Sequence, residues 1–212
     1  MPDDDVESDA RAAERLTFFS DAVVAIAITL LAIDLPVPEG ATVGKFWGSV
    51  KLDDGHYAAF LISFAVIAAA WRDHHTLFRF AKRVDPRLLT LNTFWLLAIV
   101  LNPFATKLLT VGAQTTATHA LRFGFYALLQ VLESGMLFAM LRHLIARGLA
   151  DPPRSVVDGL TRKSISMTLG FGLSIPVFFV ITDGWLLWIA GPVLGGMLRR
   201  RQRRSPRVPE GS

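Results

Sequence analysis

Long apolar stretches separated by short polar segments occupy most of this chain. The first stretch holds about 21 residues, which as a helix span roughly 30 Å, the thickness of a bilayer core. The last stretch holds only about 14 apolar residues, so a re-entrant pair is an alternative for the last two stretches. The pattern predicts an all-α polytopic membrane protein with six transmembrane helices at residues 15–35, 57–71, 88–109, 118–144, 165–181 and 185–198.

The distribution of basic residues predicts the topology. Of the 22 Lys and Arg residues, 18 fall on one side of the predicted membrane, counted over the two ends and every second connection. The other side carries only Lys45, Lys51, Lys107 and Arg122. By the positive-inside rule both termini are cytoplasmic, which requires an even number of crossings.

Three regions follow from the same pattern. Residues 1–13 are acidic and polar, and we expect a disordered tail there. Residues 14–198 form the six-helix transmembrane domain, and residues 199–212 form a basic cytoplasmic tail. The basic tail is better explained as an anchor on anionic lipid than as a nucleic-acid site.

The composition narrows the class of function. The chain is 52% hydrophobic and only 19% charged, which is too apolar for a soluble domain of this size. With no cysteine, disulfides and cysteine-ligated metals are excluded. His74 and His75 are adjacent and would point about 100° apart on a helix, so a metal site is not expected. No phosphate loop, nucleophile elbow or paired acidic motif is present, so we expect neither an enzyme nor a cofactor.

Two acidic residues lie at membrane depth. Asp21 lies inside the first stretch, where a carboxylate costs about 2.5–3.5 kcal/mol on insertion scales. Its partners must come from other helices, and Trp71, His74 and Asn92 offer N–H donors near the same predicted membrane face. Asp21 is therefore either a structural latch or part of a transport site. Glu133, in the fourth stretch, either accepts hydrogen bonds from neighbouring helices or lines a water-filled cavity.

The run R-x-x-x-F-S-D is the most specific motif in the chain. It is formed by Arg15, Phe19, Ser20 and Asp21, and it resembles the signature of the transmembrane protein 175 family of potassium channels. The later runs W-R-D-H-H at 71–75, N-T-F-W-L-L at 92–97 and N-P-F at 102–104 support this resemblance. It implies one six-helix unit per chain and a homotetramer whose central pore is lined by the first helix.

The resemblance also implies which residues line the pore. Ile26 matches the large apolar position of the gate, with Leu30 and Ile33 further along, and Thr29 matches a hydroxyl position associated with ion preference. On a helical wheel these four residues share one arc with Phe19, whereas Asp21 points away from it. Ala25 departs from the pattern, since some family members have serine there.

These observations predict a potassium-permeable channel in the cell membrane, with a hydrophobic constriction acting as gate and filter. The expected partners are further copies of the chain, membrane lipid and the permeant potassium ion, with no nucleic acid. A proton-coupled transporter that uses Asp21 or Glu133 is the alternative function. A purely structural membrane protein is a third reading, and it would show no ion flux.

Overall fold

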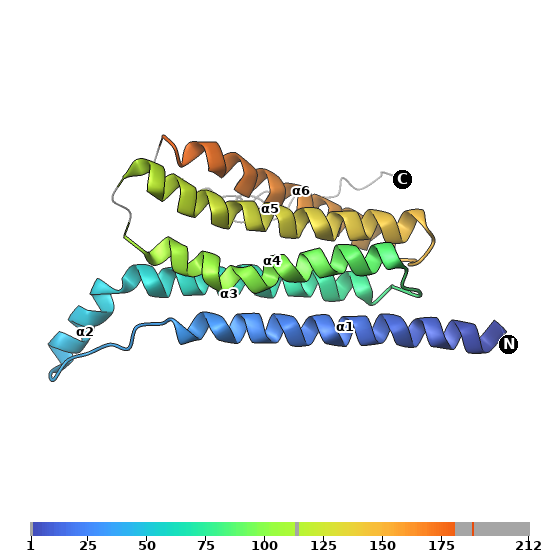
Figure 1. Ribbon diagram of the computed structural model, residues 1–212, viewed down its shortest axis with the longest axis horizontal. Helices are drawn as coiled ribbons and strands as arrows, with labels where there is room; N and C mark the ends of the chain where they lie inside the picture. Colours follow the sequence, from blue (N-terminus) through green and yellow to red (C-terminus); the bar gives the residue numbers. More distant parts are fainter. Residues whose placement is uncertain (1, 113–114, 181–187, 189–212) are drawn as a thin grey trace, which may run out of the picture.

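The structure is a computed structural model that describes residues 2–112, 115–180 and 188 of the 212-residue chain. Five long helices lie alongside one another, and a short helix stands at one end of the bundle (Figure 1). The helices are α1 (Pro2–Ile33), α2 (Val43–Leu52), α3 (Asp54–Phe78), α4 (Pro86–Thr110), α5 (Thr116–Ala146) and α6 (Arg154–Val177).

The predicted spans correspond to most of the long helices. Four segments are long and apolar enough to cross a membrane, namely Arg11–Ile33 within α1, and the whole of α3, α4 and α5. The predicted fifth span falls on α6 and the residues after it, and the first half of α6 is markedly polar. The predicted sixth span, 185–198, lies outside the described residues except for Trp188. The all-α fold class holds throughout the described part of the chain.

Two features differ from the expectation. Helix α1 begins at Pro2, so residues 2–13 are helical where we expected a disordered tail. The helix dipole stabilises carboxylates near a helix N-terminus. Asp9 also forms an ion pair with Arg83, with 3.1 Å between Asp9 Oδ2 and Arg83 Nε. Helix α2 was not predicted, and its N-terminus is capped by Thr42, whose hydroxyl accepts from the Lys45 N–H at 3.3 Å.

Local capping defines where the long helices start and stop. The Asp85 carboxylate accepts from the Leu88 N–H at 2.8 Å, directly before Pro86 opens α4. Thr115 and Thr118 form a capping box at the start of α5. Gly148, with φ of 65°, takes the left-handed conformation that commonly follows a helix C-terminus.

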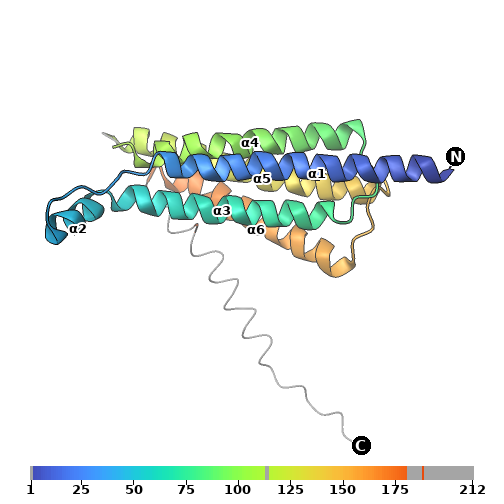
Figure 2. The ribbon, with the colours of Figure 1, turned by 90° about the horizontal axis from the view of Figure 1, so that it is seen from below.

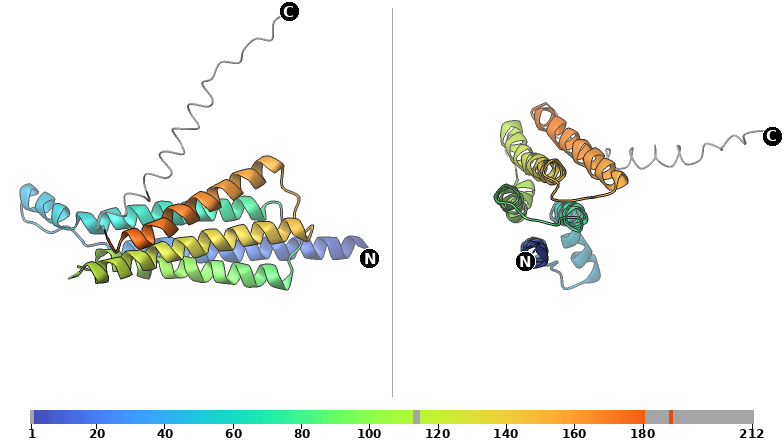
Figure 3. Two further views of the ribbon diagram at one scale, coloured as in Figure 1. Left: turned by 90° about the horizontal axis from the view of Figure 1, so that it is seen from above. Right: turned by 90° about the vertical axis from the view of Figure 1, so that its right-hand side faces the viewer.

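The helices pack in an order that places α1 at one edge of the bundle. Helix α1 contacts α3 and α4, and α5 packs between α4 and α6 (Figure 3). Successive long helices run in opposite directions, so the chain's N-terminus lies at the same end as the α3–α4 and α5–α6 connections (Figure 2). Those connections carry many of the basic residues, including Lys82, Arg83 and Arg147.

Large apolar side chains cover the outer faces of the bundle. This is the surface expected of a protein surrounded by lipid rather than water. Examples from α3 to α6 are Leu61, Phe94, Leu97, Leu121, Leu169 and Leu173. The interior between α1, α3, α4 and α5 is apolar as well, with Val24, Ile67, Trp95 and Leu141 fully or almost fully buried.

Candidate functional site

One face of α1 is covered by its neighbours and the opposite face is not. Ser20, Val24, Ala27 and Leu31 are buried against the bundle at three- and four-residue spacing. The proposed pore residues all lie on the uncovered side, where Ile26 is 60% exposed and Ile33 is 75% exposed. Phe19, Thr29 and Leu30 are exposed on the same side. The arc found on the helical wheel is therefore the accessible face of α1 in the single chain.

Asp21 binds α3 through two side chains. The Trp71 Nε1–H donates to Asp21 Oδ1 at 2.8 Å, and His75 Nδ1 lies 3.6 Å from Asp21 Oδ2. Trp71 is one of the three donors suggested by the sequence, whereas His75 was not among them. These contacts connect α1 to α3 at the edge of their interface.

The other two suggested donors do not reach Asp21: Asn92 donates to Ser20, and His74 bonds to Asn92. The Asn92 amide donates to Ser20 Oγ at 3.0 Å, and the Ser20 hydroxyl donates to the Leu16 carbonyl at 2.9 Å. His74 Nε2 lies 2.7 Å from Asn92 Oδ1, and it must be the donor because that oxygen only accepts. Ser20, His74 and Asn92 are all buried, and the chain of bonds crosses α3, α4 and α1.

Aromatic rings enclose His74 on both faces. The His74 ring stacks between Phe78 and Trp95, each with its centroid 4.2 Å away. Within the described residues, no group of three His, Cys, Asp or Glu side chains could hold a metal ion. Arg15, the first residue of the signature, is exposed and makes no hydrogen bond or ion pair in the described part of the chain.

A second polar cluster lies deep in the bundle between α4 and α5. The Asn102 amide donates to Glu133 Oε1 and to the Ala98 carbonyl, and Asn102 Oδ1 accepts from Gln130 Nε2 at 2.8 Å. All of these side chains are buried. The sequence identified Glu133 as costly, but it did not identify Asn102 as its partner.

The polar cluster continues from Asn102 toward the C-terminal end of α4. The Thr106 hydroxyl donates to Ser63 Oγ at 2.7 Å, and the Ser63 hydroxyl donates to Tyr126 Oη at 3.2 Å. Sequence reasoning missed these three residues. The available signal was Asn102 and Thr106 at four-residue spacing, which places two polar side chains on one face of an apolar helix.

Residues 15–103 match the family described as "Endosomal/lysosomal potassium channel TMEM175". A potassium channel from Streptomyces collinus is 32% identical over 171 residues, which cover 78% of this chain and 82% of that protein. The chain belongs to the TMEM175 family. The matched residues include all of the α1 signature and its contacts on α3 and α4.

Other TMEM175 relatives agree in sequence and in fold. The crystal structure of a lysosomal potassium-selective channel TMEM175 homolog from Chamaesiphon minutus aligns with a TM-score of 0.70 and 26% identity. The alignment covers 90% of this chain and 98% of that one. The endosomal/lysosomal proton channel TMEM175 of Bos taurus is 39% identical over 88 residues, which are 38% of this chain and 18% of that protein.

Membership of the TMEM175 family confirms several predictions. The chain is an all-α multi-pass membrane protein with a six-helix unit. The family is one of ion channels, so the chain is not an enzyme.

Side-chain contacts to neighbouring segments lie at both ends of α4 in this TMEM175 unit. At one end Lys107 Nζ lies 2.7 Å from Asp34 Oδ1. At the other end His143 Nε2 lies 2.7 Å from Asp85 Oδ2. Burial alone would raise the pKa of Asp85, but the Leu88 N–H, the contact with His143 and the charge of Arg147 outweigh it, so this pKa lies below its ordinary value.

Proposed function

We propose that this chain forms a potassium-permeable cation channel in the cell membrane. The support is its family, together with relatives described as a potassium channel and a potassium-selective channel. We also propose that both termini are cytoplasmic, because the basic connections and the described N-terminus gather at one end of the bundle.

The observation that carries the proposal is the uncovered face of α1. The described helices pack on only one side of α1, so a single chain does not surround Ile26, Thr29, Leu30 and Ile33. A pathway along this face requires further copies of α1. We propose four copies around a central axis, with the Ile26 side chains forming the narrowest ring.

An apolar ring of this kind obstructs ions by dewetting. An ion must shed water there, and no oxygen atom replaces the lost shell until the ring dilates and refills. Potassium loses its water more easily than sodium, which favours potassium without a cage of carbonyl oxygens. The Thr29 hydroxyl donates to the Ile26 carbonyl at 2.8 Å, so its oxygen keeps acceptor capacity next to this ring.

The contacts of the signature residues with α3 and α4 give α1 a fixed rotation in this proposal. Asp21 with Trp71, and Ser20 with Asn92, hold the opposite side of α1 against α3 and α4. We propose that these residues act as a latch, with Arg15 and Phe19 on the outer side of the same segment. Because Asp21 bonds to the bundle, its role is to position α1 rather than to bind the permeant ion.

A proton-coupled transporter is the second candidate. It is favoured by the buried acid Glu133, and one relative is described as a proton channel. Such a transporter would have to move its substrate in proportion to a proton gradient, through Asp21 or Glu133.

Ion flux from purified protein in liposomes separates the two candidates. Vesicles loaded with potassium should release it down its gradient at equal pH inside and outside, and sodium-loaded vesicles should release less. Flux that appears only when a pH gradient is imposed would support the transporter. No flux of either ion would contradict both candidates and leave a structural role.

A further inference from the structure

The carboxyl group of Glu133 has an unusual set of neighbours. Glu133 is 3% exposed, and Asn102 donates to its Oε1. No described protein group bonds to its Oε2, which is also buried. The orientation of the Asn102 amide is fixed, because its oxygen accepts from Gln130 and its nitrogen also donates to the Ala98 carbonyl. Exchanging the amide oxygen and nitrogen would break both of these hydrogen bonds.

A cavity lies next to this carboxyl group, among α3, α4, α5 and α6. Its volume is about 30 Å³, and polar groups of Gln130, Ser134 and Ser164 line it beside Glu133. A polar cavity holds a water molecule when it offers roughly 10–15 Å³ or more together with two to four polar partners. The cavity therefore has room for about two water molecules.

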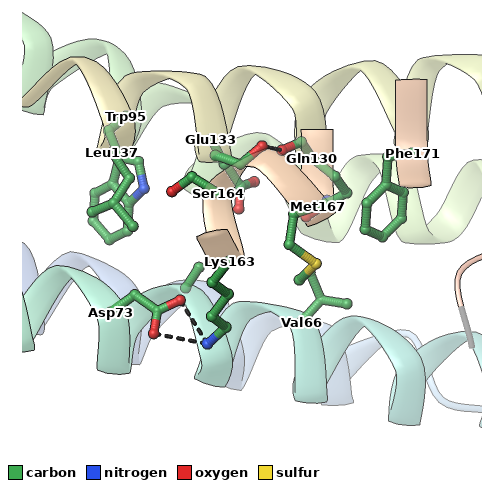
Figure 4. Close-up of a pocket in the computed structure, with 12 residues that line it drawn as sticks. Val66, Asp73, Trp95, Gln130, Glu133, Leu137, Lys163, Ser164, Met167 and Phe171 are labelled. Atoms are coloured by element: carbon green, nitrogen blue, oxygen red, sulfur yellow. Dashed lines mark hydrogen bonds and ion pairs between the residues drawn. The ribbon is translucent and has the colours of Figure 1, made fainter. Parts of the chain in front are cut away.

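Within the part of the chain that the structure describes, no cation is paired with Glu133. Across the cavity, Lys163 Nζ is bound to Asp73 at 2.6 and 2.7 Å (Figure 4). Among the described residues, the other ionisable side chain near Glu133 is Tyr126 on the same helix, and α4 contributes only uncharged groups to the cavity lining. An ionised carboxylate offers about four acceptor positions. Among the described residues, only the Asn102 amide donates to the Glu133 carboxyl group. A neutral carboxyl group suits this site better, because its O–H can donate to cavity water.

We propose that Glu133 is a proton-binding site within each subunit, which exchanges its proton with solvent through cavity water beside the Asp73–Lys163 pair. Lys163 is 35% exposed, so the pair lies where the cavity approaches the surface. The proton passes from the carboxyl O–H to a water molecule and then to bulk water, and the reverse steps reload the carboxylate. Glu133 lies on α5, away from α1, so this site is separate from the proposed pore and does not depend on it.

Infrared spectroscopy of the purified full chain in lipid tests this proposal. The wild-type protein should show a protonated-carboxyl stretching band near neutral pH that Glu133→Gln lacks. The band should shift in D₂O as the proton exchanges, and it should disappear as the pH is raised. The proposal is overturned if wild type and Glu133→Gln have the same spectrum at every pH, or if the band neither exchanges nor titrates.

A second variant keeps the test decisive even if Glu133→Gln does not fold. Lys163→Met removes the cation that faces the cavity. Without this positive charge the ionised form of Glu133 is less favourable, so the band of protonated Glu133 should persist to higher pH. Lys82→Met is the matched control, because Lys82 also pairs with an aspartate, at 3.8 Å from Asp151, but on an exposed loop. If the Glu133 band disappears at the same pH in Lys163→Met and in Lys82→Met, the proposed proton exchange beside the Asp73–Lys163 pair is overturned.

Discussion

Asn92→Ala is the substitution that most directly probes how α1 is held. The amide of Asn92 is buried and joins Ser20 on α1 to His74 on α3. Each lost hydrogen bond costs about 0.5–1.5 kcal/mol net, and leaving the buried His74 N–H without a partner costs about 1–3 kcal/mol. We expect a total loss of about 2–6 kcal/mol in the free energy of unfolding.

Thermal melting of the purified protein in detergent measures this loss. Thr93→Ala is the control, because Thr93 is the next residue, is exposed, and bonds only to the Leu89 carbonyl of its own helix. Asn92→Ala should melt several degrees lower than this control, at roughly 2–4 °C per kcal/mol for a chain of this size.

A double-mutant cycle with Ser20→Ala then isolates the bond between α1 and α4. Measured couplings between membrane helices average about 0.6 kcal/mol and reach about 1.7 kcal/mol. Additive losses in the cycle, or equal melting of Asn92→Ala and Thr93→Ala, would refute the view that this buried bond holds α1.

Three further predictions concern assembly and stability. Asp21→Asn should weaken assembly or gating, because it removes the charge that faces Trp71 and His75. The potassium preference of the surviving channels should stay largely unchanged. A large selectivity change with normal assembly would instead place Asp21 in the pathway. Native mass measurement in mild detergent should find a tetramer, and a monomer as the sole species would contradict the proposed pore. Asp85→Asn should lower stability by up to about 1 kcal/mol at neutral pH, because asparagine still caps α4 but lacks the charge that faces His143 and Arg147. The pKa of Asp85 in the folded chain lies below its ordinary value, so the Asp85 carboxylate stabilises the fold fully at pH values above the ordinary pKa. This stabilisation is lost as the pH falls from the ordinary pKa through the folded pKa. Because the variant has no carboxyl group at this position, its melting should not show this acid-dependent loss.

Apolar length was sufficient to predict the first four spans, whereas the arc of α1 that is accessible followed from the resemblance to the transmembrane protein 175 family. Side-chain pairing was harder to predict, because α1 is apolar on all sides and periodicity does not reveal its rotation. Asn92 was expected to reach Asp21, and it bonds to the preceding residue, Ser20. One residue along a helix is a turn of about 100°, which is enough to exchange one partner for another.

Other differences have similarly local causes. Helix α2 is only ten residues long and contains two glycines, which lower its helix propensity, although Val43, Phe46, Trp47 and Val50 follow helical spacing. The partner of Glu133 depends on the depth at which α4 and α5 pass each other, and the sequence does not encode that depth in a single residue. The pairing with Asn102 thus emerges only when the packed helices are known.

In the proposed channel, α1 lines the pore with Ile26 at the constriction. The most direct measurement is the single-channel conductance and the potassium-to-sodium permeability ratio of Ile26→Asn in planar bilayers, with Ile165→Asn as control. Ile165 is 48% exposed on α6, the helix at the far side of the bundle from α1 (Figure 3). Because an amide holds water where isoleucine excludes it, Ile26→Asn should raise conductance and reduce the preference for potassium, and the control should change neither. Unchanged conductance and preference in Ile26→Asn, with both altered in Ile165→Asn, would contradict the account.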